Sequence, residues 1–348
     1  MEPSAVKPCL KVVGLHVEGF RALRRVDWPA DGIGWNGEVP DLVMVGGVNG
    51  SGKTTLLELI AAAARTLEDW TDSVPFEPLT GNASFDFKVA SQEIGASSLR
   101  VLIGNEDFIK RERRGKDSLT FTRRQDGYYP GSPTPASDKV TSLLATPEGF
   151  PRSSFPGIVY LPTSRWLYIP KEDYKAAGSL APPKDFFYRF SPAKEWSGSL
   201  EALLYSARWM DLNAKEEGHP ELATHFESYA KAFHAFFGDS KSLIWEGGEL
   251  FVKIAETGAR HPLMALSSGE KQALILAAEL YRRWRPGSLI IIDEPELHFH
   301  TSWQTTLWTM LERWQKERGG QVIVATQSTH LFRIAAPETT VLLGGPLA

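Results

Sequence analysis

The segment GVNGSGKTT, residues 47–55, constrains the fold of this chain more than any other feature of the sequence. It satisfies the pattern G-x-x-x-x-G-K-[ST], and it lies between a predicted strand at Leu42 to Val45 and a predicted helix at Thr54 to Leu67. A strand, a glycine-rich loop and a helix in this order let backbone N–H groups and a helix N-terminus face a polyphosphate. We therefore expect an α/β fold in which this loop binds phosphate.

The residues of this loop have separate predicted roles. Lys53 is expected to reach the β- and γ-phosphates of a nucleotide, and the Thr54 hydroxyl is expected to hold Mg²⁺. The residues predicted to bind the nucleotide here are Gly47, Asn49, Gly50, Ser51, Gly52, Lys53, Thr54 and Thr55.

A second motif, LIIIDEPELHFH at residues 289–300, brings two carboxylates to the end of an apolar run. Large aliphatic residues are typical of a central strand that is buried on both faces, and ligands bind at the carboxyl ends of such strands. Asp293 is predicted to complete the Mg²⁺ shell, and Glu294 to orient and deprotonate an attacking water. The pair His298 and His300 has no third ligand at a convincing spacing, which disfavours a metal site there.

The segment ALSSGEKQ, residues 265–272, predicts a second phosphate contact at the start of a helix. Ser267 and Ser268 offer hydroxyls, Gly269 permits a close backbone approach, and the helix dipole points at the anion. After this helix, strands and helices alternate from residue 288 to residue 343, which predicts a largely parallel sheet with helices on its faces.

In this order, the glycine-rich loop, LSSGEKQ and IIDEPELHFH resemble the ATP-binding-cassette (ABC) class of ATPases. More specifically, they resemble the branch shared by RecF, Rad50, structural-maintenance-of-chromosomes (SMC) and overcoming-lysogenisation-defect (OLD) proteins. The segment VEGFRAL, residues 17–23, is similar to the Asn-Phe-Arg-like segment of the RecF and OLD branch, which implies that Arg21 lies near the nucleotide. The resemblance covers residues 10–66 and 263–344 well.

This resemblance implies a P-loop NTPase fold of the ABC-ATPase type, with a mixed sheet, a β-rich subdomain and a helical insert, and with ATP and Mg²⁺ as cofactors. The predicted domains are an ATPase core of residues 1–66 and 264–348, a β-rich part of residues 67–163, and a mainly helical insert of residues 164–263. The resemblance also implies a head-to-tail dimer, in which Ser267, Ser268 and Gly269 of one copy lie over the γ-phosphate bound by the other. OLD proteins usually continue into a Toprim nuclease domain, which we do not expect here, so an effector such as a nuclease or toxin is predicted to be a separate protein.

One position departs from the cassette pattern. These ATPases commonly have a histidine at the end of the strand after the acidic motif, and VIVATQSTHLF places Gln327 there instead. Glutamine donates hydrogen bonds but carries no positive charge, so Gln327 as the catalytic contact predicts slow turnover. His330 is an alternative contact, and Gln92 or the segment Thr163 to Arg165 is a candidate for the glutamine-bearing loop of the family.

The charge pattern offers one candidate nucleic-acid contact. The chain has a net charge of −4, but residues 110–124 hold seven basic and two acidic residues. If residues 111–116 form a hairpin tip, these cations suit contact with a phosphate backbone, although a solvated hairpin turn remains an alternative. The predicted DNA contacts are Lys110, Arg111, Arg113, Arg114 and Lys116.

Composition narrows the class of protein further. Cys9 is the only cysteine, so no internal disulfide forms, and the longest apolar runs are too short to cross a membrane. We expect a cytoplasmic ATPase that acts on nucleic acid or controls an effector, of a DNA-repair or antiviral-defence type by analogy. One alternative is a non-catalytic ATP-dependent scaffold or switch. The other is the ATPase subunit of a transporter, which the segment Glu296-Leu297-His298 after the acidic motif disfavours.

Overall fold

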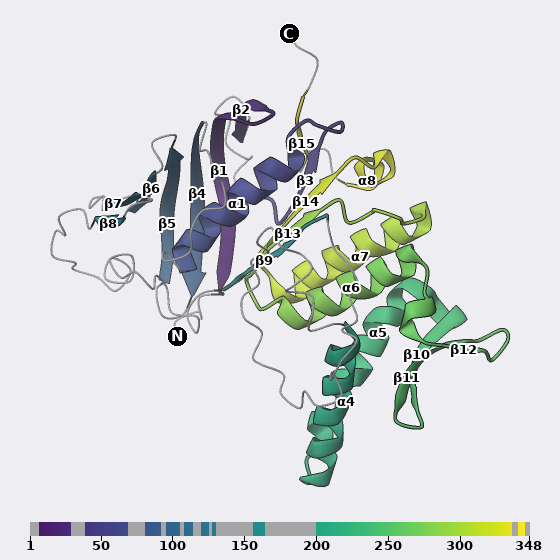
Figure 1. Ribbon diagram of the computed structural model, residues 1–348. Helices are drawn as coiled ribbons and strands as arrows, with labels where there is room; N and C mark the ends of the chain where they lie inside the picture. Colours follow the sequence, from purple (N-terminus) through teal and green to yellow (C-terminus); the bar gives the residue numbers. More distant parts are fainter. Residues whose placement is uncertain are drawn as a thin grey trace, which may run out of the picture. The chain divides into compact units, whose positions relative to one another are not determined.

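The computed structural model (Figure 1) describes ten segments of the chain. They are residues 7–28, 39–68, 81–91, 95–104, 108–113, 120–124, 127–129, 156–163, 200–335 and 340–344. Contacts divide the chain into two compact units, one of residues 1–162, 284–294 and 311–348, and the other of residues 163–283 and 295–310. The bounds of the three predicted domains differ from those of these two units, and the three-domain division stays a prediction.

A parallel sheet of five strands forms one layer of the first unit. Its order is β15-β3-β14-β13-β9, and each neighbouring pair is parallel. The strands are β3 (Leu42–Gly46), β9 (Ile158–Leu161), β13 (Leu289–Asp293), β14 (Gln321–Thr326) and β15 (Thr340–Leu342). Every residue of β9, β13 and β14 is buried, as expected for strands that are covered on both faces.

An antiparallel sheet of seven strands forms a second layer, in the order β2-β1-β4-β5-β6-β7-β8. Its strands are β1 (Cys9–Phe20), β2 (Leu23–Trp28), β4 (Asn82–Ser91), β5 (Gly95–Gly104), β6 (Phe108–Arg113), β7 (Thr120–Arg124) and β8 (Gly127–Tyr129). Parallel and antiparallel strands thus occur in separate sheets. Arg111 and Arg113 belong to strand β6, which corrects the prediction that residues 111–113 are part of a hairpin tip, and residues 114–119 lie outside the described residues.

Helix α1 (Lys53–Glu68) runs between these two sheets (Figure 1) and contacts strands of both. Its apolar residues cover more than one face, because Leu56, Leu57, Leu59 and Ile60 are all buried. A helix that is apolar on nearly all sides is stable only when it is enclosed. The helix that follows the glycine-rich loop is therefore held in place from two directions.

The side chain of Gln321 links the two sheets. It is fully buried at the start of β14, and its amide oxygen accepts a hydrogen bond from the backbone N–H of Val12 in β1 at 2.8 Å. Its amide nitrogen donates to the backbone carbonyls of Val12 at 3.2 Å and Pro40 at 3.0 Å. One polar side chain thereby satisfies backbone groups of β1 and of the residues that lead into β3.

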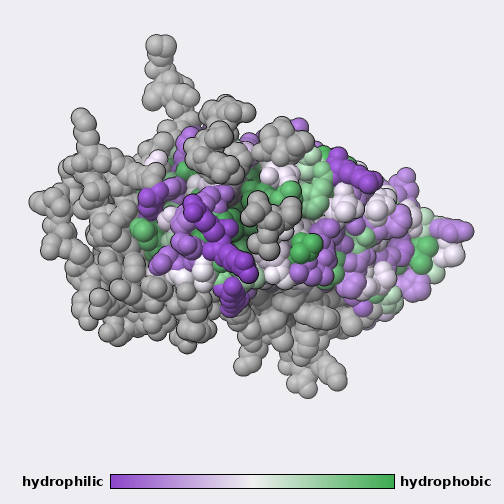
Figure 2. All heavy atoms as spheres, turned by 90° about the horizontal axis from the view of Figure 1, so that it is seen from above, coloured by the Kyte–Doolittle hydropathy of each residue, from purple (hydrophilic) through white to green (hydrophobic). Residues whose placement is uncertain are grey.

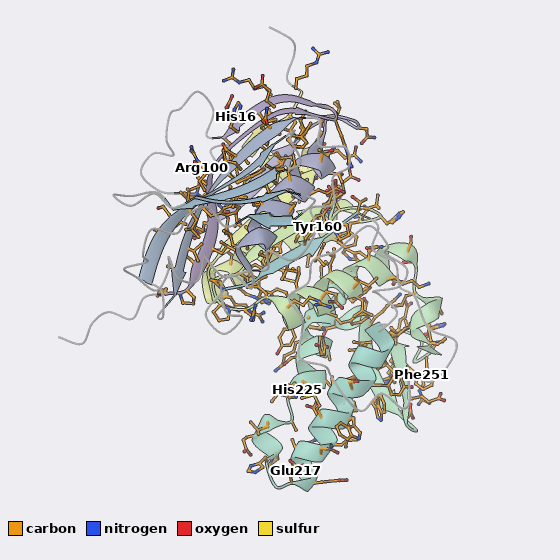
Figure 3. The ribbon with its side chains drawn as sticks, turned by 60° about the vertical axis from the view of Figure 1, so that its left-hand side comes forward. His16, Arg100, Tyr160, Glu217, His225 and Phe251 are labelled. Carbon is orange, nitrogen blue, oxygen red and sulfur yellow. The ribbon has the colours of Figure 1, made fainter. Side chains whose placement is uncertain are left out.

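The second unit is built mainly from helices. They are α4 (Leu200–Glu216), η4 (Pro220–Leu222), α5 (His225–Phe237), η5 (Gly238–Ser240), η6 (Leu263–Ala265) and α6 (Ser268–Arg283). A small sheet of β10 (Lys241–Glu246), β11 (Glu249–Ile254) and β12 (Arg260–His261) joins them, and Phe251 marks it in Figure 3. Aromatic rings from Phe236 and Phe237 of α5 pack edge to face on Trp303.

A buried carboxylate, that of Asp211, explains where helix α5 begins. Asp211 of α4 accepts hydrogen bonds from the backbone N–H groups of His225 and Phe226, both at 2.9 Å. It also pairs with the His225 ring at 3.0 Å (Figure 3 labels His225). These contacts satisfy N–H groups at a helix start, so α5 begins at His225 rather than continuing from η4.

Two helices complete the description, α7 (Thr301–Arg318) and α8 (Thr329–Ile334). On the face seen in Figure 2, hydrophilic and hydrophobic residues are interspersed over the described part of the chain. Within the described residues, no helix has both the length and the apolar character that a membrane crossing needs.

We expect Gln321→Ala to lower the free energy of unfolding by about 3 kcal/mol, because it leaves buried backbone groups of Val12 and Pro40 without partners. Urea denaturation measures the loss. Gln315→Ala is the matched control, since Gln315 is also buried but its hydrogen bond to the Gly320 carbonyl is long, at 3.4 Å. Equal losses for the two variants would show that Gln321 does not link the sheets.

Candidate functional site

Three neighbouring strands of the parallel sheet end at the same edge and carry the predicted catalytic residues. Strand β14 lies between β3 and β13, with Thr326 opposite Gly46 and Ala325 opposite Asp293. The glycine-rich loop follows β3, Glu294 follows β13, and Gln327 follows β14. Because parallel strands present their carboxyl ends together, segments far apart in the sequence meet at one edge.

The glycines of the loop are required by its backbone and by its neighbours. Gly50 and Gly52 have positive φ angles of 81° and 94°, which favour glycine. A Cβ atom on Gly52 would lie 2.4 Å from Leu23 Cδ2, and one on Gly47 would lie 2.3 Å from Ser51 Oγ. Asn49 and Gly50 are exposed, whereas Thr55 is buried at the base of α1.

Lys53 is folded back onto the loop. Its side chain is 5% exposed, and its Nζ donates to the carbonyls of Gly47 at 3.0 Å and Val48 at 3.3 Å. The same Nζ lies 3.7 Å from Glu294 Oε1. A buried ammonium is thereby surrounded by oxygen atoms, an arrangement that phosphate oxygens could replace.

Thr54 and Asp293, the two predicted Mg²⁺ ligands, are in direct contact. The Thr54 hydroxyl donates to Asp293 Oδ2 at 2.7 Å, although 239 positions separate the residues in the sequence. Asp293 is fully buried at the end of β13. An alcohol oxygen and a carboxylate are hard oxygen ligands, which are the type that Mg²⁺ prefers.

Glu294 has an unusual backbone conformation. Its φ angle is 43°, and its N–H donates to the carbonyl of Ala325 at 2.8 Å. A positive φ angle in a residue other than glycine costs energy and is common at active sites. The conformation leaves the Glu294 side chain only partly buried, next to Lys53.

Arg21 lies in the turn between β1 and β2, also with a positive φ angle, of 49°. Its Nη1 donates to Glu58 Oε2 at 3.2 Å. Burial raises the pKa of the Glu58 carboxyl, the charge of Asp293 raises it further, and Arg21 offsets part of this rise. The sequence analysis missed Glu58, whose only signal was its place four residues after Thr54, on the same helix face.

Gln327 lies between β14 and α8 with an exposed side chain. Ser328 begins α8 as its N-cap, because its hydroxyl accepts the Leu331 N–H at 3.2 Å. His330, the alternative contact, is the second residue of α8 and is half-buried.

In the second unit, Ser267 and Ser268 are exposed at the start of α6, and Gly269 is buried. A Cβ atom on Gly269 would lie 2.6 Å from the carbonyl oxygen of His298, which itself has a φ angle of 70°. Packing against the backbone of residue 298 thus explains why position 269 is a glycine. The predicted close approach of a phosphate to Gly269 is a separate reason.

Several predicted positions lie outside the residues or side chains that the structure describes. Gln92, Arg114, Lys116 and residues 164–165 lie outside the described residues, and Lys110, Arg111 and Arg113 are placed only as backbone positions of β6. Among the described residues, no group of three His, Cys, Asp and Glu side chains could hold a metal ion, and this includes the surroundings of His298 and His300.

Comparison with known proteins adds a partial family match. Residues 254–333 match a family described as "AAA domain, putative AbiEii toxin, Type IV TA system". This segment contains the Ser267 turn, the Asp293–Glu294 motif and Gln327, but not the glycine-rich loop. The parallel sheet, with the glycine-rich loop between β3 and α1, agrees with the predicted fold of a P-loop NTPase. No curated protein sequence matches the chain.

Solved structures of SMC head domains are similar over most of the chain. The SMC head bound to the C-winged helix domain of ScpA is 16% identical, with a TM-score of 0.45, and covers 92% of this chain and 91% of its own. The SMC head domain from Thermotoga maritima is 14% identical, with a TM-score of 0.41, and covers 95% of this chain and 93% of its own. These low scores assign no residue role.

We expect Glu58→Gln to raise the melting temperature at pH 7 to 8, because the fold disfavours the ionised carboxyl whose pKa is raised. The penalty is complete above the folded pKa and vanishes below the unfolded value of 4.5, so the gain shrinks as the pH falls toward 4.5. Thermal unfolding from pH 4.5 to 8 tests this. Glu227→Gln is the control, since Glu227 is 63% exposed and pairs with Lys231 on the surface. A lower melting temperature for Glu58→Gln at pH 8 would contradict the prediction.

Proposed function

We propose that this chain is a Mg²⁺-dependent ATPase that dimerises head to tail around ATP, and that the ATP-bound dimer acts on nucleic acid or controls a separate effector. The observation that carries the ATPase proposal is the contact between Thr54 and Asp293 at the sheet edge, beside Lys53 and Glu294. Each of these residue types suits a different part of phosphoryl transfer to water.

The contacts of Lys53 support a change of partner when ATP binds. Its Nζ lies among the carbonyls of Gly47 and Val48 and near the Glu294 carboxylate. Phosphate oxygens carry more negative charge than carbonyls, so Lys53 transfers to the β- and γ-phosphates. Glu294, no longer paired with Lys53, then accepts the proton of an attacking water.

The residues present fit Mg²⁺, since the Thr54 hydroxyl and the Asp293 carboxylate are already in direct contact. When bound, the ion would neutralise negative charge on the phosphates during phosphoryl transfer. Arg21 is proposed to leave Glu58 and contact the nucleotide, and the exposed Gln327 is proposed to donate a hydrogen bond to the γ-phosphate. The loop residues Gly47, Asn49, Gly50, Ser51, Gly52 and Thr55 complete the proposed nucleotide site.

The dimer proposal rests on the turn at Ser267, Ser268 and Gly269. Its two exposed hydroxyls and the start of the 16-residue helix α6 suit a phosphate that a second copy presents. The partial match to a family described as a putative toxin supports the antiviral-defence type of function, whereas the separate effector rests on the resemblance to OLD proteins. The seven basic residues among positions 110–124 support nucleic acid as the other candidate partner.

We expect the Glu294→Gln protein to change from monomer to dimer when ATP and Mg²⁺ are added, because bound ATP joins the copies and is not hydrolysed. Light scattering coupled to size exclusion measures the mass. Lys53→Ala in the same background is expected to stay monomeric. A Glu294→Gln protein that remains a monomer at saturating ATP would overturn the dimer proposal.

Mixing two variants tests the head-to-tail arrangement. Ser267→Arg blocks one half of the composite site and Lys53→Ala the other, so in the Glu294→Gln background each protein alone should stay monomeric. A mixture of the two contains one intact site per heterodimer and should dimerise. Ser242→Arg, at an exposed position of β10, is the matched control for the added arginine and should dimerise by itself.

Gln327 predicts slow hydrolysis, because a glutamine cannot place a positive charge on the γ-phosphate. We expect a turnover below about 1 per second, where a typical enzyme reaches about 10 per second. Gln327→His is expected to raise it several-fold and Gln327→Ala to lower it, as measured by phosphate release. Turnover of the unmodified protein at tens per second, without nucleic acid, would refute this role.

A further inference from the structure

A carboxylate lies at the turn that is proposed to receive a phosphate. The backbone N–H of Ser267 donates to Glu270 Oε2 at 2.8 Å, and the N–H of Glu270 donates to Ser267 Oγ at 3.4 Å. This reciprocal pair of bonds is a capping box, which fixes the first turn of α6. The same bonds hold the negative charge of Glu270 beside the hydroxyl of Ser267.

An uncompensated carboxylate in this place opposes the binding of any anion. Like charges a few ångströms apart repel, and the repulsion is stronger for groups that are shielded from water. The Glu270 side chain is only 13% exposed. A phosphate at Ser267 and Ser268 therefore requires a compensating positive charge.

Lys241 supplies this charge from another element of the same unit. It is the first residue of β10, and its Nζ donates to Glu270 Oε1 in an ion pair that is largely shielded from water. Burial alone raises the pKa of Glu270, but the hydrogen bonds from Lys241 and Ser267 outweigh burial and leave the pKa below its ordinary value. Glu270 is thus ionised at neutral pH, with both oxygens occupied.

The position of Lys241 is set by its sheet. Lys241 pairs with Ile254 of β11, and the N–H of Ala255 donates to the carbonyl of Ser240 at 2.9 Å. The neighbouring strand β12 leads through Pro262 and η6 directly into the Ser267 turn. The small sheet thereby brings a lysine to the beginning of the helix that follows it in the sequence.

We propose that Lys241 is a positioning residue that neutralises Glu270, so that the Ser267 turn can receive the negatively charged phosphate of ATP held by a second copy. The proposal rests on the ATP-dependent dimer proposed above. Lys241 does not touch the phosphate itself. It acts through Glu270, whose capping bonds hold Ser267 in place.

The test uses the Glu294→Gln background and measures the dimer dissociation constant with ATP and Mg²⁺ by sedimentation. Lys241→Met should weaken the dimer about tenfold. Adding Glu270→Gln to Lys241→Met should restore most of the affinity, because the glutamine keeps the capping bond but carries no charge. Lys231→Met, which breaks the exposed pair of Lys231 with Glu227 on α5, is the matched control and should change nothing.

Salt distinguishes charge neutralisation from a structural role. Because ions screen the repulsion from Glu270, the deficit of Lys241→Met should shrink as the salt concentration rises from about 0.05 M to 0.5 M. Circular dichroism and thermal melting establish that each variant is folded. A deficit that is independent of salt, and that Glu270→Gln does not repair, would overturn the proposal.

The proposal and the function on which it rests fail in different ways. A Glu294→Gln protein that stays monomeric with ATP overturns the dimer and this inference together. A Glu294→Gln protein that dimerises equally well with and without Lys241 overturns the role of Lys241 alone.

Discussion

The hydrogen bond between Thr54 and Asp293 is the interaction on which the candidate site depends. It joins the first turn of α1 to the end of β13, two segments that the fold brings together only when β3, β14 and β13 are correctly paired. Helix α1 in turn is enclosed by apolar contacts from both sheets. Packing in the core thereby determines the distance between the two predicted oxygen ligands at the edge.

Three residues other than glycine have positive φ angles among the described residues, namely Arg21, Glu294 and His298. Arg21 and Glu294 lie in segments that the sequence analysis associates with ATP, and His298 lies in the segment that follows the acidic motif. Strain of this kind persists only where the surrounding structure holds it, as the bond from Glu294 N–H to Ala325 does. The three strained positions therefore lie in or directly after the predicted site segments, whose roles stay a prediction.

Local patterns predicted the fold better than they predicted the contacts of the site. The predicted strand at Leu42 to Val45 and the predicted helix at Thr54 to Leu67 agree with β3 and α1 to within one residue at each end, because a run of apolar residues and helical spacing are local signals. Glu58, Lys241 and Gln321 were missed, since each is a polar residue within an ordinary helix or strand pattern. Their partners Arg21, Glu270 and Val12 lie 37, 29 and 309 positions away in the sequence.

The contact between Gly269 and His298 changes how the Ser267 turn is understood. A glycine in this motif suggests that a phosphate approaches the backbone, yet here the carbonyl of His298 already occupies the space that a Cβ would need. The turn is therefore shaped from within its own unit by the segment that follows Glu294. The geometry of the proposed phosphate contact thus depends on the loop after the acidic motif as well as on the capping box of α6.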